Sequence, residues 1–108
     1  MSVTLIHVDE RHTWTDEDSK AGFIFRRPTS RLQREIQAKH TKKGDVDSNA
    51  VVDEMLEWAI LDWFGFVDHT GVPVTYNKEY LGQVPEVIKS RFVVQFYAAS
   101  PDKAELGN

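Results

Sequence analysis

Two pairs of residues in this chain combine side-chain types and a spacing that acid–base chemistry could use. Asp53 and Glu57 stand four residues apart, so on a helix they would share one face, where paired carboxylates can act as acid and base. Asp62 and His69 could form a second pair across a short turn. Simpler interpretations are favoured for both pairs. Asp53 and Glu57 would form a solvated helix face. Asp62 would bond to a backbone N–H in the following turn or to an arginine, because an unpaired buried carboxylate is costly.

No other motif typical of a catalytic, metal or phosphate site is present in the sequence. The four histidines stand singly, so a metal site would have to be assembled from distant elements. There is no glycine-rich phosphate loop and no G-x-S-x-G nucleophile motif. The chain has no cysteine, which excludes disulfides, thiolate metal sites and a cysteine nucleophile. We therefore expect a protein without enzymatic activity and without a cofactor.

Length and composition indicate one globular domain. The chain has 108 residues, of which 41% are hydrophobic, and this is enough for one modest core. No apolar run approaches the roughly 18 to 20 residues that span a bilayer, and the N-terminus lacks the pattern of a signal peptide. We expect a single domain over residues 1–100, a polar flexible tail over residues 101–108, no membrane association and a cytoplasmic location.

Charge is distributed unevenly along the chain. The formal net charge is −4, which argues against a general nucleic-acid binder. Residues 26–43 nevertheless contain seven basic side chains and a single acid, Glu35. The basic residues are Arg26, Arg27, Arg31, Arg34, Lys39, Lys42 and Lys43. This basic stretch could meet RNA or an acidic protein, but a solvated helix face and loop is favoured because the whole chain is acidic.

The hydrophobic pattern predicts a mainly α-helical α+β fold, with three to four helices and a small N-terminal β-hairpin. The hairpin would pair Val3–Val8 with Gly22–Arg26, where β-branched and aromatic residues gather before Pro28. A helix over residues 28–40 would follow, with Ser30 in a capping box.

The second half of the chain predicts three further helices. One would be capped by Asp47 or Ser48 and continue through Phe64, and a polar glycine-containing loop would precede it. A short helix over residues 78–82 would follow Asn77, and a last helix would begin at Pro85. A strand over residues 92–97 is the alternative for that last segment.

Two of these predicted helices carry more apolar surface than a domain of this size can bury. The C-terminal half of the second helix and most of the last helix are apolar nearly all round. Trp58, Trp63 and Phe64 could stack on a planar ligand, but no basic residues are interleaved among them, so core plus protein interface is favoured. We expect self-association or a protein partner, with contacts through Ile60, Leu61, Phe64, Val94 and Tyr97.

The order of motifs in the chain resembles that of tail assembly chaperones of long-tailed bacteriophages and prophages. In that family an apolar helix ends in a Trp-containing segment and runs into a D-x-x-G-x-P turn, an extended piece, a short helix and a last apolar helix. The matching residues here are Trp63, Phe64, Asp68, Gly71, Pro73, Tyr76, Leu81, Pro85 and Phe92. The upstream segment "FIFRRPTSRLQREIQ" is also similar to the strand and helix start of that family, so the resemblance covers about residues 20–99.

This resemblance implies a small, mainly helical, non-enzymatic protein that forms homo-oligomers in the host bacterial cytoplasm. It would bind the tape measure protein, keeping that long helical chain soluble, and would contact the tail tube subunit. A longer form made by ribosomal frameshifting would extend from the tail after Ser100. Two alternatives stay open: a small RNA-binding or regulatory module that uses residues 26–43, and another phage head–tail morphogenesis protein.

Overall fold

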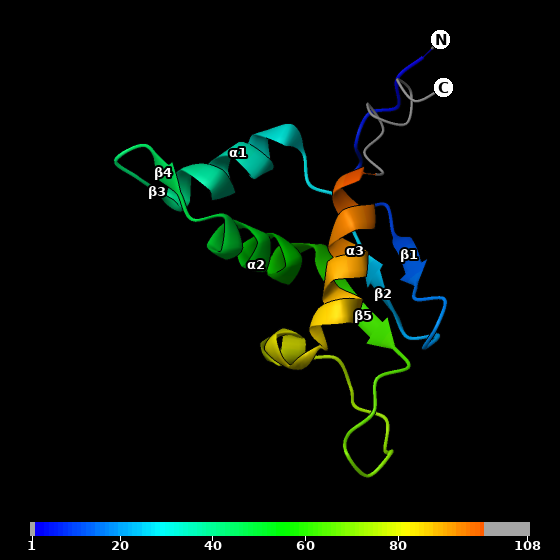
Figure 1. Cartoon of the computed structure of the whole chain (residues 1–108). Helices are drawn as coiled ribbons and strands as arrows, with labels where there is room; N and C mark the ends of the chain where they lie inside the picture. Colours follow the sequence, from blue (N-terminus) through cyan, green and yellow to red (C-terminus); the bar gives the residue numbers. More distant parts are fainter. Residues whose placement is uncertain (1, 99–108) are drawn as a thin grey trace.

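The computed structural model describes residues 2–98 and shows an α+β fold rather than a mainly helical one. Helices account for 42% of the structure and strands for 20%, so the sheet is a principal part of the fold and the predicted mainly α class is wrong. The elements, all labelled in Figure 1 except η1, are β1 (His12–Thr15), β2 (Gly22–Phe25), α1 (Ser30–Lys39), β3 (Thr41–Lys42), β4 (Asp45–Val46), α2 (Ser48–Ala59), β5 (Ile60–Phe64), the 3₁₀ helix η1 (Lys78–Gln83) and α3 (Glu86–Ala98).

The prediction failed at β5, which the sequence pattern had assigned to the end of the second helix. α2 ends at Ala59, and the chain passes directly into a strand that pairs antiparallel with β2. β2 also pairs antiparallel with β1, so the strand order is β1-β2-β5. The apolar residues predicted to surround the end of a helix therefore alternate between the two faces of a sheet.

The N-terminal hairpin forms, but at other residues than predicted. β1 occupies His12–Thr15 and places Trp14 opposite Phe23, whereas Val3–Val8 has no strand partner within residues 2–98. The connection from β1 to β2 is shorter than the predicted one, which lowers the entropy cost of closing it. Trp14 also brings a larger apolar side chain to the sheet than the valines, leucine and isoleucine of Val3–Val8 could.

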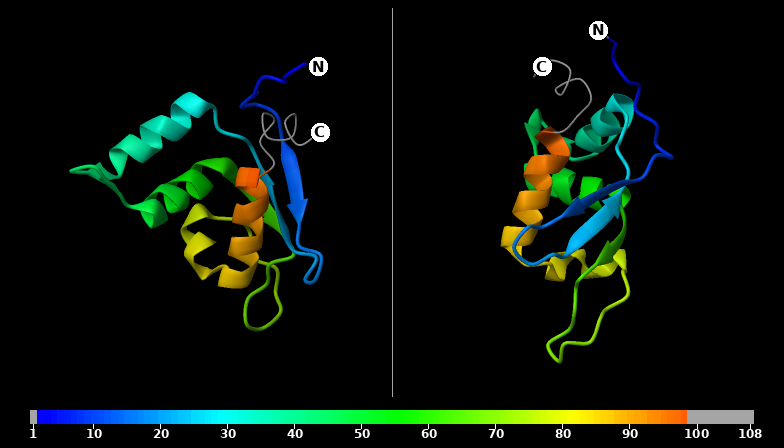
Figure 2. Two further views of the ribbon diagram at one scale, coloured as in Figure 1. Left: turned by 45° about the horizontal axis from the view of Figure 1, so that its top comes forward. Right: turned by 90° about the vertical axis from the view of Figure 1, so that its right-hand side faces the viewer.

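The core lies between α3 and one face of the three-stranded sheet, and it continues into α1, α2 and η1 through the buried residues Ile36, Met55, Leu56, Ala59 and Leu81. The Phe92 ring contacts three rings of this face, with centroid distances of 4.9 Å to Phe23, 5.1 Å to Phe25 and 5.4 Å to Trp14. Figure 2 shows α3 against one face of the sheet, with no described element covering the other face. The uncovered face is called the open sheet face below. α1 and α2 extend from this body as a pair of helices joined by the small β3–β4 hairpin (Figure 1).

The predicted helix caps are largely confirmed. The Asp47 carboxylate accepts a hydrogen bond from the Ala50 backbone N–H, and Asn77 caps η1 in the same way. α1 is capped by Thr29 rather than by Ser30. The last segment is a helix, as predicted, and the Pro85 carbonyl accepts the first backbone bonds of α3. The predicted tail, residues 101–108, lies outside the described residues.

Candidate functional site: exposed apolar faces and an aromatic pocket

Each carboxylate of the two candidate acid–base pairs faces solvent or has a structural partner. Asp53 accepts a hydrogen bond from Lys89 Nζ at 3.2 Å, and Glu57 is exposed beside it on α2. Asp62 is exposed and accepts the backbone N–H of Trp63 at 2.8 Å, a donor in the same strand rather than in the following turn. Within residues 2–98, no hydrogen bond joins Asp62 to His69, and no group of three or more His, Asp or Glu side chains could hold a metal ion.

The basic stretch is divided among separate structural contacts. The Arg26 guanidinium lies 4.0 Å from the centre of the Trp58 ring, and its Nε donates to the Trp58 carbonyl. Arg27 Nη1 donates to the Phe96 carbonyl at 2.8 Å, near the end of α3. Arg31 pairs with Glu35 and Lys39 pairs with Glu54. Arg26 and Arg27 are thus held against the fold, and Arg31 and Lys39 are paired with acids at the surface, which weakens the case for an RNA-binding surface.

The three aromatic residues that could have stacked on a planar ligand lie in different places. Trp58 is covered by Arg26, and Trp63 belongs to a separate group of aromatic rings. Phe64 lies across Gly22 on the open sheet face, where a Cβ on that glycine would come within 2.5 Å of the Phe64 ring. The three side chains therefore do not form a single stack.

The residues predicted to make protein contacts divide into buried, half-buried and exposed groups. Ile60 is only 3% exposed and packs in the core, so the prediction that it contacts a partner is wrong. It pairs with Phe25 in the sheet, which turns its side chain toward α3. Leu61, the extra residue at a β-bulge, and Phe64 are half-buried. Val94 is 62% exposed and Tyr97 is 39% exposed, so both can reach a partner.

α3 has apolar residues on two opposite sides. Ile88, Phe92 and Phe96 form the side that packs on the sheet. On the other side lie Val87, Ser90, Val94 and Tyr97, here called the outer stripe, in which Val87 is also more than half exposed. These four positions follow the alternating three- and four-residue spacing by which one helix packs along another. The prediction that the last helix is apolar nearly all round corresponds to these two stripes.

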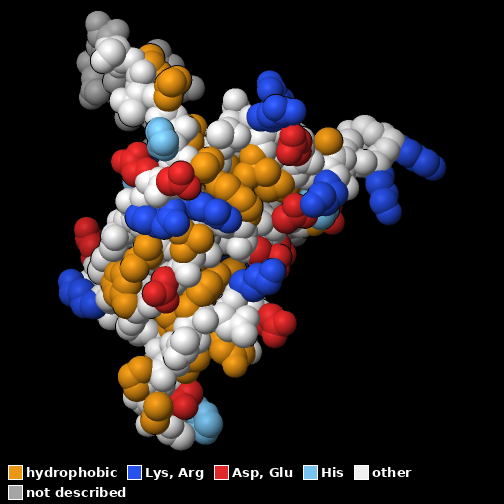
Figure 3. All heavy atoms as spheres, turned by 180° about the vertical axis from the view of Figure 1, so that it is seen from behind, with side chains coloured by type: hydrophobic (Ala, Val, Ile, Leu, Met, Phe, Trp, Pro, Cys, Tyr) orange, Lys and Arg blue, Asp and Glu red, His pale blue; other side chains and the backbone are white. Residues whose placement is uncertain are grey.

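The open sheet face is a second surface with exposed apolar atoms. Ile24 and Phe64 lie on it, both half-buried, next to the polar side chains of Thr13 and Asp62. Figure 3 views the molecule from behind and shows hydrophobic side chains spread between charged ones on that side.

A loop that projects from the body follows β5 and is held by one carboxylate (Figure 1). Asp68 Oδ1 accepts hydrogen bonds from the Thr70 backbone and hydroxyl and from the Val72 backbone, at 2.6 to 3.1 Å. Gly71 adopts a φ of +87°, which a residue with a side chain would rarely accept. The D-x-x-G-x-P pattern therefore encodes a rigid turn, closed by a bridge between Val67 and Pro73.

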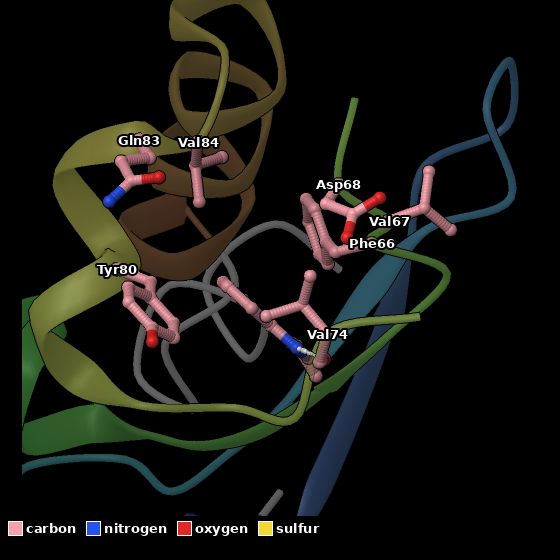
Figure 4. A pocket seen from close by; sticks show the side chains of 8 residues that line it. Phe66, Val67, Asp68, Val74, Tyr80, Gln83 and Val84 are labelled. Atoms are coloured by element: carbon pink, nitrogen blue, oxygen red, sulfur yellow. Dashed lines mark hydrogen bonds between the residues drawn. The ribbon is translucent and has the colours of Figure 1, made fainter. Parts of the chain in front are cut away.

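This loop closes a pocket that the sequence did not reveal. The cavity measures about 300 Å³, and β5, the loop and η1 line it with the side chains of Trp63, Phe66, Val67, Asp68, Val74, Tyr80, Gln83 and Val84. It is called the aromatic pocket below. The Trp63 indole N–H donates to the Val74 carbonyl at 2.7 Å. The centroid of the Phe66 ring lies 4.6 Å from that of the Trp63 ring. Figure 4 shows Tyr80 and Phe66 on opposite sides of the pocket, with Gln83 and Val84 along a third side.

Comparisons with protein-family models, with curated proteins and with solved structures find no match to this chain. Among residues 2–98, no helix combines the length and the apolar character that crossing a membrane requires. The function must therefore be argued from the outer stripe, the open sheet face, the aromatic pocket and the order of the sequence motifs.

Proposed function

We propose that this protein is a tail assembly chaperone of a long-tailed bacteriophage or prophage, which acts by binding other proteins rather than by catalysis. Its partners in this role are the tape measure protein and the tail tube subunit, in the cytoplasm of the bacterial host. It also forms homo-oligomers. The order of motifs from Trp63 to Phe92 supports this proposal, and the outer stripe of α3 is the observation that carries it.

The outer stripe is suited to receive a helical partner. Val87, Val94 and Tyr97 expose apolar surface along one side of a thirteen-residue helix. An incoming amphipathic helix can bury such a row along its length, which is how many proteins recognise helical segments. A long helical protein that is insoluble alone, such as a tape measure protein, presents apolar helix surface of this kind.

The flanks of the outer stripe also fit an interface. Glu86, Arg91 and Gln95 border it with polar side chains, and protein interfaces commonly combine an apolar centre with a polar rim. Arg91 is held by Asp16 at 2.8 Å, so one part of this rim is already ordered before a partner arrives. An ordered rim lowers the entropy cost of binding.

Co-expression with the tape measure protein of the same phage or prophage tests the proposal. We expect the tape measure protein to become soluble and to copurify with the wild-type chain. Val94→Asp places a charge in the centre of the outer stripe and should abolish copurification. Val46→Asp is the matched control, because Val46 is an exposed valine in β4, far from α3. A tape measure protein that stays insoluble with the wild-type chain, or that binds Val94→Asp equally well, would contradict the proposal.

A further inference from the structure

The aromatic pocket has a lining that suits a planar cation. Trp63, Phe66 and Tyr80 supply rings whose faces carry partial negative charge and attract cations. Among the described side chains that line the pocket, Asp68 is the only charged one. An aromatic wall beside a carboxylate favours a ligand that is both flat and positively charged, over a neutral apolar ligand or an anion.

The Asp68 carboxylate is positioned and ionised before any ligand binds. Its Oδ1 atom accepts the three hydrogen bonds that form the turn, whereas its Oδ2 atom makes no hydrogen bond within residues 2–98. The hydrogen bond from the Thr70 hydroxyl, followed by those from the Val72 and Thr70 backbone, lowers the pKa of Asp68 below its usual value. One oxygen is therefore fixed in the turn, and the other is free to accept from a ligand.

The aromatic rings are held in place as well. The indole N–H of Trp63 is already bonded to Val74, and the ring packs against Phe66 on one side and Tyr76 at 5.3 Å on another. The Tyr80 ring lies nearly parallel to Trp63, at an interplanar angle of 18°, with 6.5 Å between centroids. Rings held in this way lose little conformational entropy when a ligand binds to them.

We propose that the aromatic pocket binds the guanidinium group of an arginine side chain presented by a partner protein. The guanidinium stacks on the aromatic faces and donates to Asp68 Oδ2, and the Gln83 amide at the rim offers a further acceptor (Figure 4). Lysine fits less well because its ammonium is a compact, strongly hydrated charge that cannot stack. A cavity of about 300 Å³ is at the small end of ligand sites, which suits a single side chain. The inference does not depend on the proposed function, since any protein partner can present an arginine.

A titration of the full-length, ¹⁵N-labelled chain with N-acetyl-arginine amide tests this site directly. One side chain supplies few contacts, so we expect millimolar affinity and would titrate to about 50 mM. The indole N–H signal of Trp63 and the backbone signals of the loop after β5 should shift and saturate. The indole signals of Trp14 and Trp58 are internal controls and should not move, because neither residue lines the pocket.

Two further probes decide whether the pocket recognises both the positive charge and the planar shape of the guanidinium. N-acetyl-citrulline amide has the same planar shape without the charge, and N-acetyl-lysine amide has the charge without the plane; both should bind at least roughly threefold more weakly. Asp68→Asn keeps an acceptor oxygen for the turn but removes the charge, and should weaken arginine binding roughly tenfold. Equal binding of either probe, or no saturable shift of the Trp63 signal, would overturn the proposal. Should Asp68→Asn disturb the loop, the probe comparison on the wild-type chain still decides.

Discussion

Arg91, in the middle of α3, donates a hydrogen bond of 2.8 Å from Nη1 to the Asp16 carboxylate in the turn after β1. Asp16 is only 2% exposed, and it also accepts hydrogen bonds from the backbone N–H and the hydroxyl of Ser19. This carboxylate therefore fastens the last helix of the chain to the first hairpin. The Ser19 backbone N–H, followed by the Arg91 guanidinium, lowers the pKa of Asp16 to about 2.

The stability of the fold should therefore depend on pH in the acid range. The pKa of Asp16 is near 3.8 in the unfolded chain and about 2 in the folded one, so its contribution is complete only above about pH 5. As the pH falls toward 2, the unfolded state binds a proton that the folded state does not, and the free energy of unfolding decreases. Urea unfolding midpoints measured between about pH 6 and pH 2 should show this decrease.

Arg91→Met separates the effect of this pair from that of other acids. Without the guanidinium, the pKa of Asp16 should be less depressed, so the variant should be less stable at neutral pH and its stability should fall less steeply in acid. Glu54 and Asp68 also have lowered pKa values, but they are unchanged in the variant and contribute equally to both curves. Parallel curves for the two proteins would show that Arg91 does not stabilise the ionised Asp16.

The two sides of α3 should respond differently to truncation. Phe92 is 1% exposed and contacts rings from both strands of the hairpin, so Phe92→Ala should lower the free energy of unfolding by about 3 to 5 kcal/mol. Val94, two residues later, faces outward, and Val94→Ala should change the free energy of unfolding by less than about 0.5 kcal/mol. Chemical denaturation of both variants measures the difference. Losses of similar size would mean that Val94 is buried, contrary to its position on the outer stripe.

The elements that were predicted correctly are those fixed by interactions close in sequence. Asp47 and Asn77 cap their helices through backbone groups two or three residues away, so their side-chain types suffice to mark the helix starts. β5 was missed because its assignment depends on pairing with β2, which lies far earlier in the chain. Locally, a run such as "ILDWF" is compatible with either a helix or a strand.

The candidate surfaces also divide into those that lie on one element and those that only the tertiary fold creates. Val94 and Tyr97 are exposed, as the contacts predicted for them require, and they lie on the side of α3 opposite Phe92. The aromatic pocket could not be predicted from the sequence, because it combines Trp63 of β5 with Tyr80 of η1, and only the folded loop brings these rings together. The D-x-x-G-x-P pattern was the available signal, because it marks a rigid turn between them.

Substitutions of Arg27 and Lys43 should show which charges of the basic stretch stabilise the fold and which only face solvent. Arg27 bonds to the Phe96 carbonyl and lies over the Phe25 ring, so Arg27→Met should cost about 1 kcal/mol of unfolding free energy. Lys43, at the tip of the β3–β4 hairpin, makes no ion pair within residues 2–98, and Lys43→Ser should leave stability unchanged. Urea denaturation measures both. Tight, salt-sensitive retention of the wild-type chain on heparin, lost in Lys43→Ser, would instead revive the RNA-binding alternative.

The open sheet face gives the last prediction, which concerns self-association. Phe64 lies across Gly22 and is not part of the core, so Phe64→Asp should keep the helical circular dichroism signal while lowering the solution mass. Light scattering over a dilution series measures that mass. Thr13→Asp is the matched control, because it introduces the same charge on β1, on the same face, without removing apolar surface. If Phe64→Asp keeps the wild-type mass while Val94→Asp lowers it, the oligomer forms through α3. A variant that unfolds would place Phe64 in the core, contrary to its position across Gly22.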